Sequence, residues 1–228
     1  MREKVVIIGG GAAGFFAAVT IAESNQNLDV IILEKGTKVL QKVIVSGGGR
    51  CIVTHACFDP SEMVSYYPRG SKELLGPFHR FLCGDMMAWL ENQGVPTKIE
   101  RDGRVFPVSN KSQDIIDCFL DQTTQYNITI EKQAHVRSIN NVSNSWLVRC
   151  TACEYSGNNI LMATGSSPSS WKIISKLGHH IIDPVPSLYT FNIQSDLINS
   201  LQGISVPHAI VKIEEIGFAD EGPLLITH

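Results

Sequence analysis

The sequence lacks an excess of basic residues, which removes the main electrostatic basis for binding a nucleic acid. Its 228 residues hold 19 Lys and Arg against 22 Asp and Glu, so the formal net charge is −3. Proteins that follow a phosphate backbone usually carry clustered positive charge. We therefore predict a small-molecule substrate and no nucleic-acid partner.

Disordered and repetitive compositions are also missing. Hydrophobic residues make up 43% of the chain and charged residues 18%, which is enough apolar material for a buried core. The 19 glycines and 10 prolines are near the average share, so a collagen-like or linker-like chain is excluded. The six cysteines, in a long chain with no evident cleavable leader, predict free thiols, a cytoplasmic location and no metal site.

Charged residues are absent from one stretch, residues 5–22, which is as long as a minimal membrane span. Four glycines interrupt it, however, and its composition changes from β-branched residues at 5–8 to alanine-rich sequence beyond the glycines. This change predicts a strand, a glycine turn and a helix over 12–23, with no membrane partner. A second apolar run at 29–33 completes a βαβ unit, so we predict an α/β fold with a parallel sheet.

The remaining pattern is mixed, with helices and short strands alternating as far as residue 177. We predict helices within 72–93 and over 112–122 and 170–177, a hairpin around Asp102-Gly103, and short strands near 127–131, 135–139, 145–152 and 159–163.

Prolines 184 and 186 mark a predicted domain crossing. We place a first domain at 1–186 and the start of an incomplete, β-rich second domain at 187–228. Because the sequence stops on an apolar strand at 224–228, we expect a fragment that self-associates through the exposed strand edge.

The strongest local motif is the G-x-G-x-x-G segment Gly9–Gly14, which follows the first strand and opens the first helix. In such a motif Gly9 permits a tight turn, Gly11 lets the backbone approach a pyrophosphate, and Gly14 lets helix and strand pack closely. Glu34 lies twenty positions beyond Gly14, at the end of the second strand. A carboxylate there accepts hydrogen bonds from ribose hydroxyls, so the site favours FAD or NAD over NADP.

Two further glycine-containing segments are candidates for the same site. Ser46-Gly47-Gly48-Gly49-Arg50-Cys51 leaves backbone amides bare, and Arg50 could neutralise a pyrophosphate or a flavin oxygen. The alternative is a flexible surface loop. Ala163-Thr164-Gly165 ends an apolar strand and could bring backbone close to a cofactor, although an ordinary strand followed by a glycine turn has the same pattern.

Taken together, these segments resemble the BaiN-type (YhiN-type) flavoproteins of the glutathione-reductase-like, two-dinucleotide-binding class. The resemblance covers the whole chain, although proteins of this family continue beyond it. It rests on Gly9–Gly14, Glu34-Lys35, Ser46–Cys51, the stretch Asp102–Pro107 and Ala163–Gly165. The chain departs from the family pattern where Ile52-Val53-Thr54-His55 replaces Asn-x-Thr-Asn, which puts the local hydrogen bonding in doubt.

The resemblance implies a Rossmann-like FAD-binding domain and an FAD-dependent oxidoreductase. It implies reduction of a carbon–carbon double bond conjugated to a carbonyl, with NAD(P)H as donor. Glu34 would bind the adenosine ribose, and the backbone of Val136 would lie near the adenine. The candidate cofactor-binding residues are Gly9, Gly11, Ala12, Ala13, Gly14, Glu34, Lys35, Ser46, Gly47, Gly48, Gly49, Arg50, Val136, Ala163, Thr164 and Gly165.

No catalytic residue stands out, and the candidates are His55 and Cys51, both close to the glycine loop. Arg50 is expected to lower the pKa of the Cys51 thiol. Cys150 and Cys153 form a C-x-x-C in a strand-like run, where their side chains would face opposite sides, so we predict structural thiols. The sequence contains no second G-x-G-x-x-G motif, so it does not predict a separate NAD(P)H-binding domain. The rival hypothesis is a non-catalytic remnant that binds nucleotide or serves as an interaction module.

Overall fold

The computed structural model describes residues 2–185, 195–196, 200–201 and 203–226. The chain divides into two compact units, Met1–Ile181 and Ile182–His228. The domain boundary predicted at residue 186 falls outside the described residues and stays a prediction. Each unit is treated separately below.

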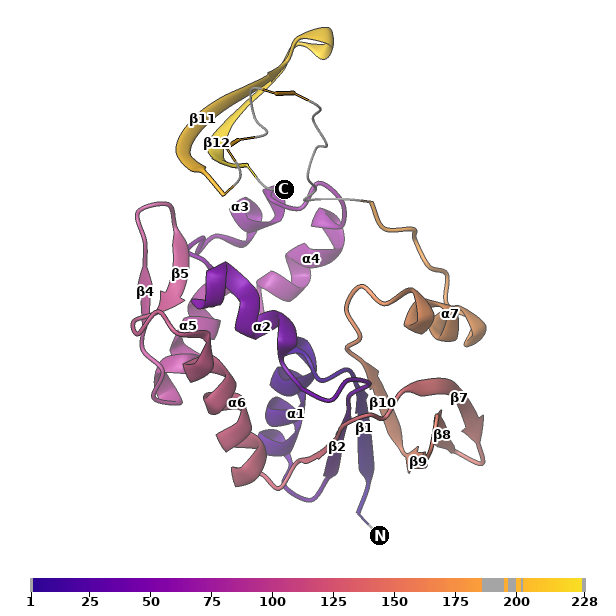
Figure 1. The fold of residues 1–228 in the computed structure, drawn as a ribbon. Helices are drawn as coiled ribbons and strands as arrows, with labels where there is room; N and C mark the ends of the chain where they lie inside the picture. Colours follow the sequence, from indigo (N-terminus) through magenta and orange to yellow (C-terminus); the bar gives the residue numbers. More distant parts are fainter. Residues whose placement is uncertain (1, 186–194, 197–199, 202, 227–228) are drawn as a thin grey trace. The chain divides into compact units, whose positions relative to one another are not determined.

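The first unit contains helices and strands in mixed order (Figure 1). Its helices are α1 (Ala12–Ser24), α2 (Gln41–Val45), α3 (Pro60–Ser65), α4 (Ser71–Phe78), α5 (Cys83–Asn92), α6 (Ser112–Gln125) and α7 (Pro168–Lys176), with a 3-10 helix at Ser46–Gly49. Its strands are β1 (Lys4–Ile8), β2 (Asp29–Leu33), β3 (Thr54–His55), β4 (Thr97–Ile99), β5 (Arg104–Pro107), β6 (Thr129–Glu131), β7 (Val136–Val142), β8 (Ser145–Cys150), β9 (Glu154–Gly157) and β10 (Asn159–Met162).

A parallel sheet of order β10-β1-β2-β6 forms the centre of this unit. The predicted strand–turn–helix over residues 5–22 is confirmed, because β1 ends before the glycine turn and α1 begins after it. Successive β1 residues point to opposite faces, so Val5 and Ile7 belong to one apolar cluster and Val6 and Ile8 to another. A strand buried on both faces needs apolar residues throughout, which explains the unbroken β-branched run.

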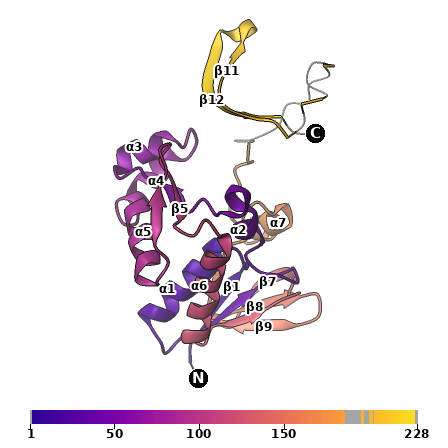
Figure 2. The ribbon, with the colours of Figure 1, turned by 60° about the vertical axis from the view of Figure 1, so that its left-hand side comes forward.

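Different layers cover the two faces of the sheet (Figures 1 and 2). On one face, Phe15, Val19, Leu90 and Phe119 from α1, α5 and α6 pack against the strands. On the other, residues of the antiparallel sheet β7-β8-β9 and of α7 form the second cluster. The predicted α/β fold with a parallel sheet is thus confirmed, and antiparallel sheets are added to it.

Beside α1 and α5 lie α3, α4 and the small antiparallel sheet β3-β5-β4 (Figure 2). The hairpin predicted around Asp102-Gly103 is present as β4 and β5. The helical pattern of 72–93 is two helices, because α4 ends at Phe78 and α5 begins at Cys83. No pattern in the sequence predicted α2, α3, β3 or β9, which are short elements that tertiary contacts hold in place.

The second unit contains the antiparallel pair β11 (Ser205–Ile213) and β12 (Phe218–Leu225), joined by a 3-10 turn at Glu214–Ile216. Several large apolar side chains of this hairpin are exposed, among them Ile210, Val211 and Phe218. The β character expected after residue 187 is therefore present in this described part. Among the described residues of both units, no helix is long and apolar enough to cross a membrane.

Candidate functional site

The glycine turn between β1 and α1 is shaped by two close backbone approaches. Gly9 has a φ of +118°, and a Cβ there would lie 2.3 Å from the carbonyl oxygen of Ala163 on the neighbouring strand end. A Cβ on Gly14 would lie 1.9 Å from the carbonyl oxygen of Gly9, so the close packing expected at Gly14 is present. At Gly11, by contrast, a Cβ would meet nothing within 4 Å. The structure therefore leaves open space at the one glycine expected to face a pyrophosphate.

The N-terminus of α1 presents free backbone amides at this open space. Gly11 is the N-cap residue, and no side chain in the described part of the chain caps the helix. Ala12 and Ala13 follow without any acidic residue in the first turn. Unpaired N–H groups and the positive end of the helix dipole favour an anionic group there.

Glu34 reaches from the end of β2 back to this turn. Its Oε2 accepts a hydrogen bond from the Gly10 amide at 2.9 Å, and its Oε1 accepts one from the Gly36 amide at 2.7 Å. The carboxylate is half-buried, and each oxygen keeps one lone pair for a further donor. The two backbone amides therefore hold the Glu34 carboxylate in place, in a position that suits an acceptor of hydrogen bonds from ribose hydroxyls.

The third predicted segment reaches the same place from β10. The amide of Ala163 bonds the carbonyl of Ile8 at 2.8 Å, and Gly165 follows with a φ of +57°. Lys42 of α2 donates from Nζ to the Ser166 hydroxyl at 3.3 Å, which places a cation beside this loop. Sequence reasoning missed Lys42, because it lies outside any motif and only α2 directs it here.

These parts enclose one large cavity of about 1360 Å³. The predicted residues that line it are Gly9, Gly11, Ala12, Ala13, Glu34, Lys35, Ser46, Cys51, Val136, Ala163, Thr164 and Gly165. Small-molecule sites usually measure about 300–1,000 Å³, so this volume suits a long dinucleotide better than a compact metabolite. The open space at Gly11 and the spare lone pairs of Glu34 fit the diphosphate and the ribose of a dinucleotide such as FAD.

The Ser46–Cys51 segment forms a glycine turn at the edge of the cavity. Gly47, Gly48 and Gly49 have φ values of +56°, +69° and +87°, and of this segment only Ser46 and Cys51 line the cavity. In this left-handed region a side chain is strained, so the glycines are required by the turn itself. Their contact with a cofactor stays a prediction.

Arg50 faces away from the cavity, toward β4 and β5. Its guanidinium pairs with Glu100, bonds Asn110 Oδ1 at 2.7 Å, and lies 3.8 Å above the ring centre of Phe106. The hydrogen bond from Arg50 holds the pKa of Glu100 below its usual value. The observed contacts fix the loop to the sheet, whereas direct neutralisation of a cofactor by Arg50 stays untested.

The two candidate catalytic residues lie in different places. Cys51 is buried at the cavity wall, and burial raises the pKa of its thiol. The expectation that Arg50 lowers this pKa is wrong, because the guanidinium is engaged by Glu100 and desolvation disfavours the thiolate. His55 is exposed in β3, outside this cavity, and its Nε2 lies 3.1 Å from the carbonyl oxygen of Asp102.

The prediction that Cys150 and Cys153 face opposite sides is also wrong. The chain turns between β8 and β9, where the Cys150 amide bonds the Cys153 carbonyl at 2.8 Å. The two thiols interact, and the pKa of Cys150 is raised to about 12, chiefly by burial. Both cysteines are free thiols, and the described residues contain no group of three or more potential metal ligands.

Comparison with known protein families identifies this architecture. Residues 3–216 match the model described as the HI0933-like protein Rossmann domain. The chain belongs to this family. It is a family of FAD-binding Rossmann oxidoreductases, and the resemblance to the BaiN and YhiN proteins is thereby confirmed.

Curated relatives match along the whole chain at low identity. The ribosomal RNA dihydrouridine synthase of Escherichia coli is 26% identical over 100% of this chain and 58% of its own length. The 3-dehydro-bile acid delta(4,6)-reductase of Clostridium scindens is 22% identical over 99% of this chain and 56% of its own length. The chain thus spans somewhat more than half the length of these relatives.

Solved structures share the fold. A 3-ketosteroid-delta4-(5alpha)-dehydrogenase from Rhodococcus jostii superimposes with a TM-score of 0.51 at 16% identity, covering 72% of this chain and 46% of its own. THI4 of Thermovibrio ammonificans superimposes with a TM-score of 0.50 at 12% identity, covering 76% of this chain and 62% of its own. At these identities the likeness concerns the Rossmann-like fold alone.

Proposed function

We propose that this chain binds FAD and forms the cofactor-binding part of an oxidoreductase that reduces a carbon–carbon double bond conjugated to a carbonyl. The observation that carries the proposal is the continuous cavity that extends from Glu34 and the glycine turn to the apolar wall at Cys51 and Val53. Its volume of about 1360 Å³ and its two chemically different ends support a dinucleotide with a polar adenosine half and a flat flavin half.

Three groups of residues would hold the cofactor. Glu34 would accept hydrogen bonds from the adenosine ribose, and the amides that open α1 would hold the diphosphate, with Lys42 as an additional cation. Backbone at Ala134–Val136 would flank the adenine, since the Ala134 amide bonds the Glu34 carbonyl at 2.8 Å. When bound, the flavin supplies the hydride chemistry, and the protein supplies position and exclusion of water.

The relatives support a substrate with a conjugated double bond. Dihydrouridine differs from uridine by a saturated C5–C6 bond next to a ring carbonyl, and a delta(4) double bond in a 3-dehydro bile acid is conjugated to its ketone. In both reductions the substrate gains two electrons and two protons. For each C=C bond that is reduced, one NAD(P)H would supply both electrons and one proton as a hydride and become NAD(P)⁺. Solvent would supply the second proton.

The names of these two relatives indicate different kinds of substrate: a free small molecule for the bile acid reductase and a base in RNA for the dihydrouridine synthase. The net charge of −3 favours a small molecule for this chain, since phosphate contacts need clustered cations. Uridine in RNA is the second candidate, because two curated relatives at 26% identity carry that name.

A nucleotide-binding module without catalysis is the alternative function, because burial raises the pKa of the candidate Cys51 and the candidate His55 lies outside the cofactor cavity. The discriminating experiment measures the flavin absorbance of the purified protein and its consumption of NADH or NADPH with an enone or quinone acceptor. Bound flavin with acceptor-dependent turnover supports the enzyme. Bound flavin without turnover supports the non-catalytic module, and a protein that cannot be reconstituted with FAD refutes both.

A further inference from the structure

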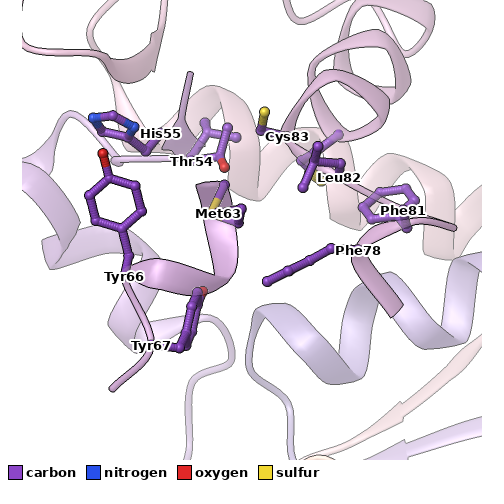
Figure 3. Close-up of a pocket in the computed structure, with 11 residues that line it drawn as sticks. Thr54, His55, Met63, Tyr66, Tyr67, Phe78, Phe81, Leu82 and Cys83 are labelled. Atoms are coloured by element: carbon purple, nitrogen blue, oxygen red, sulfur yellow. The ribbon is translucent and has the colours of Figure 1, made fainter. Parts of the chain in front are cut away.

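A second cavity of about 540 Å³ lies in the first unit, between β3 and the helices α3, α4 and α5 (Figure 3). It is separate from the residues that the cofactor motifs identify. Its lining is almost entirely apolar or aromatic, and it includes His55, Tyr66, Tyr67, Phe78, Phe81 and Met86. The volume lies within the range of about 300–1,000 Å³ that small-molecule sites occupy.

Aromatic rings line this cavity, which we call the aromatic pocket. The rings of Tyr67 and Phe78 have centroids 5.6 Å apart at an interplanar angle of 51°. Tyr67 is 41% exposed and Tyr66 59% exposed, although both rings have apolar faces that water solvates poorly. Large aromatic side chains gathered around one concavity and left partly uncovered are typical of a ligand site.

A few polar atoms lie at one end of the aromatic pocket. The Tyr66 hydroxyl points toward the His55 ring, and the two ring centroids are 5.7 Å apart (Figure 3). Because the Asp102 carbonyl can only accept, the hydrogen bond at His55 Nε2 places the ring proton on that nitrogen. A Cβ on Gly103 would lie 2.5 Å from this nitrogen, so Gly103 is what lets the ring settle against the turn.

The aromatic pocket adjoins the cofactor cavity. Val53 and Met86 line both cavities. Phe16 of the cofactor cavity packs on Phe81 of the aromatic pocket, with centroids 5.2 Å apart. A flat molecule in the aromatic pocket would therefore lie beside the apolar wall at Cys51 and Val53, at the end of the cofactor cavity assigned above to the flavin half.

We propose that the aromatic pocket binds the conjugated ring of the substrate, a planar ring whose C=C bond is conjugated to a ring carbonyl. The proposal rests on the function proposed above and adds the location of the substrate. The ring packs against the wall that Tyr67 and Phe78 form together, and the Tyr66 hydroxyl donates to its carbonyl oxygen. This binding chemistry is shared by a steroid-like enone and by a uracil base, which the experiment separates.

The test uses equilibrium dialysis to measure the affinity of the flavin-loaded protein for 4-androstene-3,17-dione and, separately, for uridine. Tyr67→Leu removes one ring wall and is expected to weaken binding roughly tenfold. Tyr66→Phe keeps the ring and removes the donor, with an expected loss of about fivefold. Phe58→Leu is the matched control, because Phe58 is a 59% exposed aromatic residue outside the pocket lining. Flavin absorbance and circular dichroism check every variant.

The outcomes separate the two proposals. The proposed pocket is supported if Tyr67→Leu weakens the binding of either probe, Phe58→Leu does not, and the FAD content of both variants is unchanged. The probe that binds more tightly then identifies the class of ring. If the protein keeps FAD but binds neither probe, or if Tyr67→Leu and Phe58→Leu bind the probes equally well, the assignment of the substrate to the aromatic pocket is refuted. The proposed function is then unaffected. Preparations that never hold FAD overturn the proposed function, whatever the dialysis shows.

Discussion

Replacing Glu34 by Gln tests the cofactor assignment most directly, because this side chain has two separable tasks. In the structure its carboxylate accepts hydrogen bonds from the Gly10 and Gly36 amides. Gln keeps one acceptor oxygen and turns the other atom into a donor, so one of these half-buried amides loses its partner. Such a loss costs about 1–3 kcal/mol for a buried group, and the lower end applies here.

The expected change in the melting temperature of the apo protein follows from that free energy. For a chain of this size, about 1 kcal/mol lowers Tm by roughly 2–4 °C. The second task concerns FAD, since a hydrogen bond to a charged group contributes about 1.5–3 kcal/mol. We therefore expect FAD to bind the E34Q protein roughly 10- to 100-fold more weakly.

The assay combines calorimetric melting of the apo protein with titration of FAD followed by fluorescence. Glu23→Gln is the matched control, because Glu23 is exposed near the end of α1 and does not line the cavity. It should leave both quantities unchanged. If E34Q lowers Tm but binds FAD as tightly as the wild type, Glu34 only braces the turn, and the assignment of the ribose to this residue is refuted.

Four further predictions follow from other parts of the structure. Gly14→Ala should prevent accumulation of folded protein, because its Cβ meets a carbonyl at 1.9 Å, whereas Gly84→Ala, with contacts of 3.5 Å, should fold normally by circular dichroism. The lowered pKa of Glu100 contributes stability that is present above its ordinary value of 4.5 and lost as pH falls through the lowered pKa, so Glu100→Gln should flatten the acid side of a Tm–pH profile. Cys51 should react with iodoacetamide more slowly than free cysteine at neutral pH, by mass spectrometry; equal rates would contradict its burial. The exposed apolar hairpin should cause concentration-dependent self-association in light scattering, which Val211→Lys reduces.

The sequence was sufficient where a local pattern dictates a local conformation. The β-branched run of β1, the glycine turn and the alanine-rich α1 follow from backbone sterics and periodicity, and they appear at the expected residues. The spacing from Gly14 to Glu34 likewise anticipated that the carboxylate reaches the turn. The parallel sheet then follows, because a βαβ crossover has little topological freedom.

Only the tertiary structure decided which of these residues face the same space. Arg50 and the glycines at 47–49 follow a motif that predicted contact with a cofactor, yet the fold turns Arg50 onto Glu100 and Phe106. Lys42 and the aromatic pocket belong to short helices with no motif, so their positions depend on contacts between distant segments. The physical reason is general: local sterics fix a turn or a strand, whereas burial and pairing across the chain choose where each side chain points.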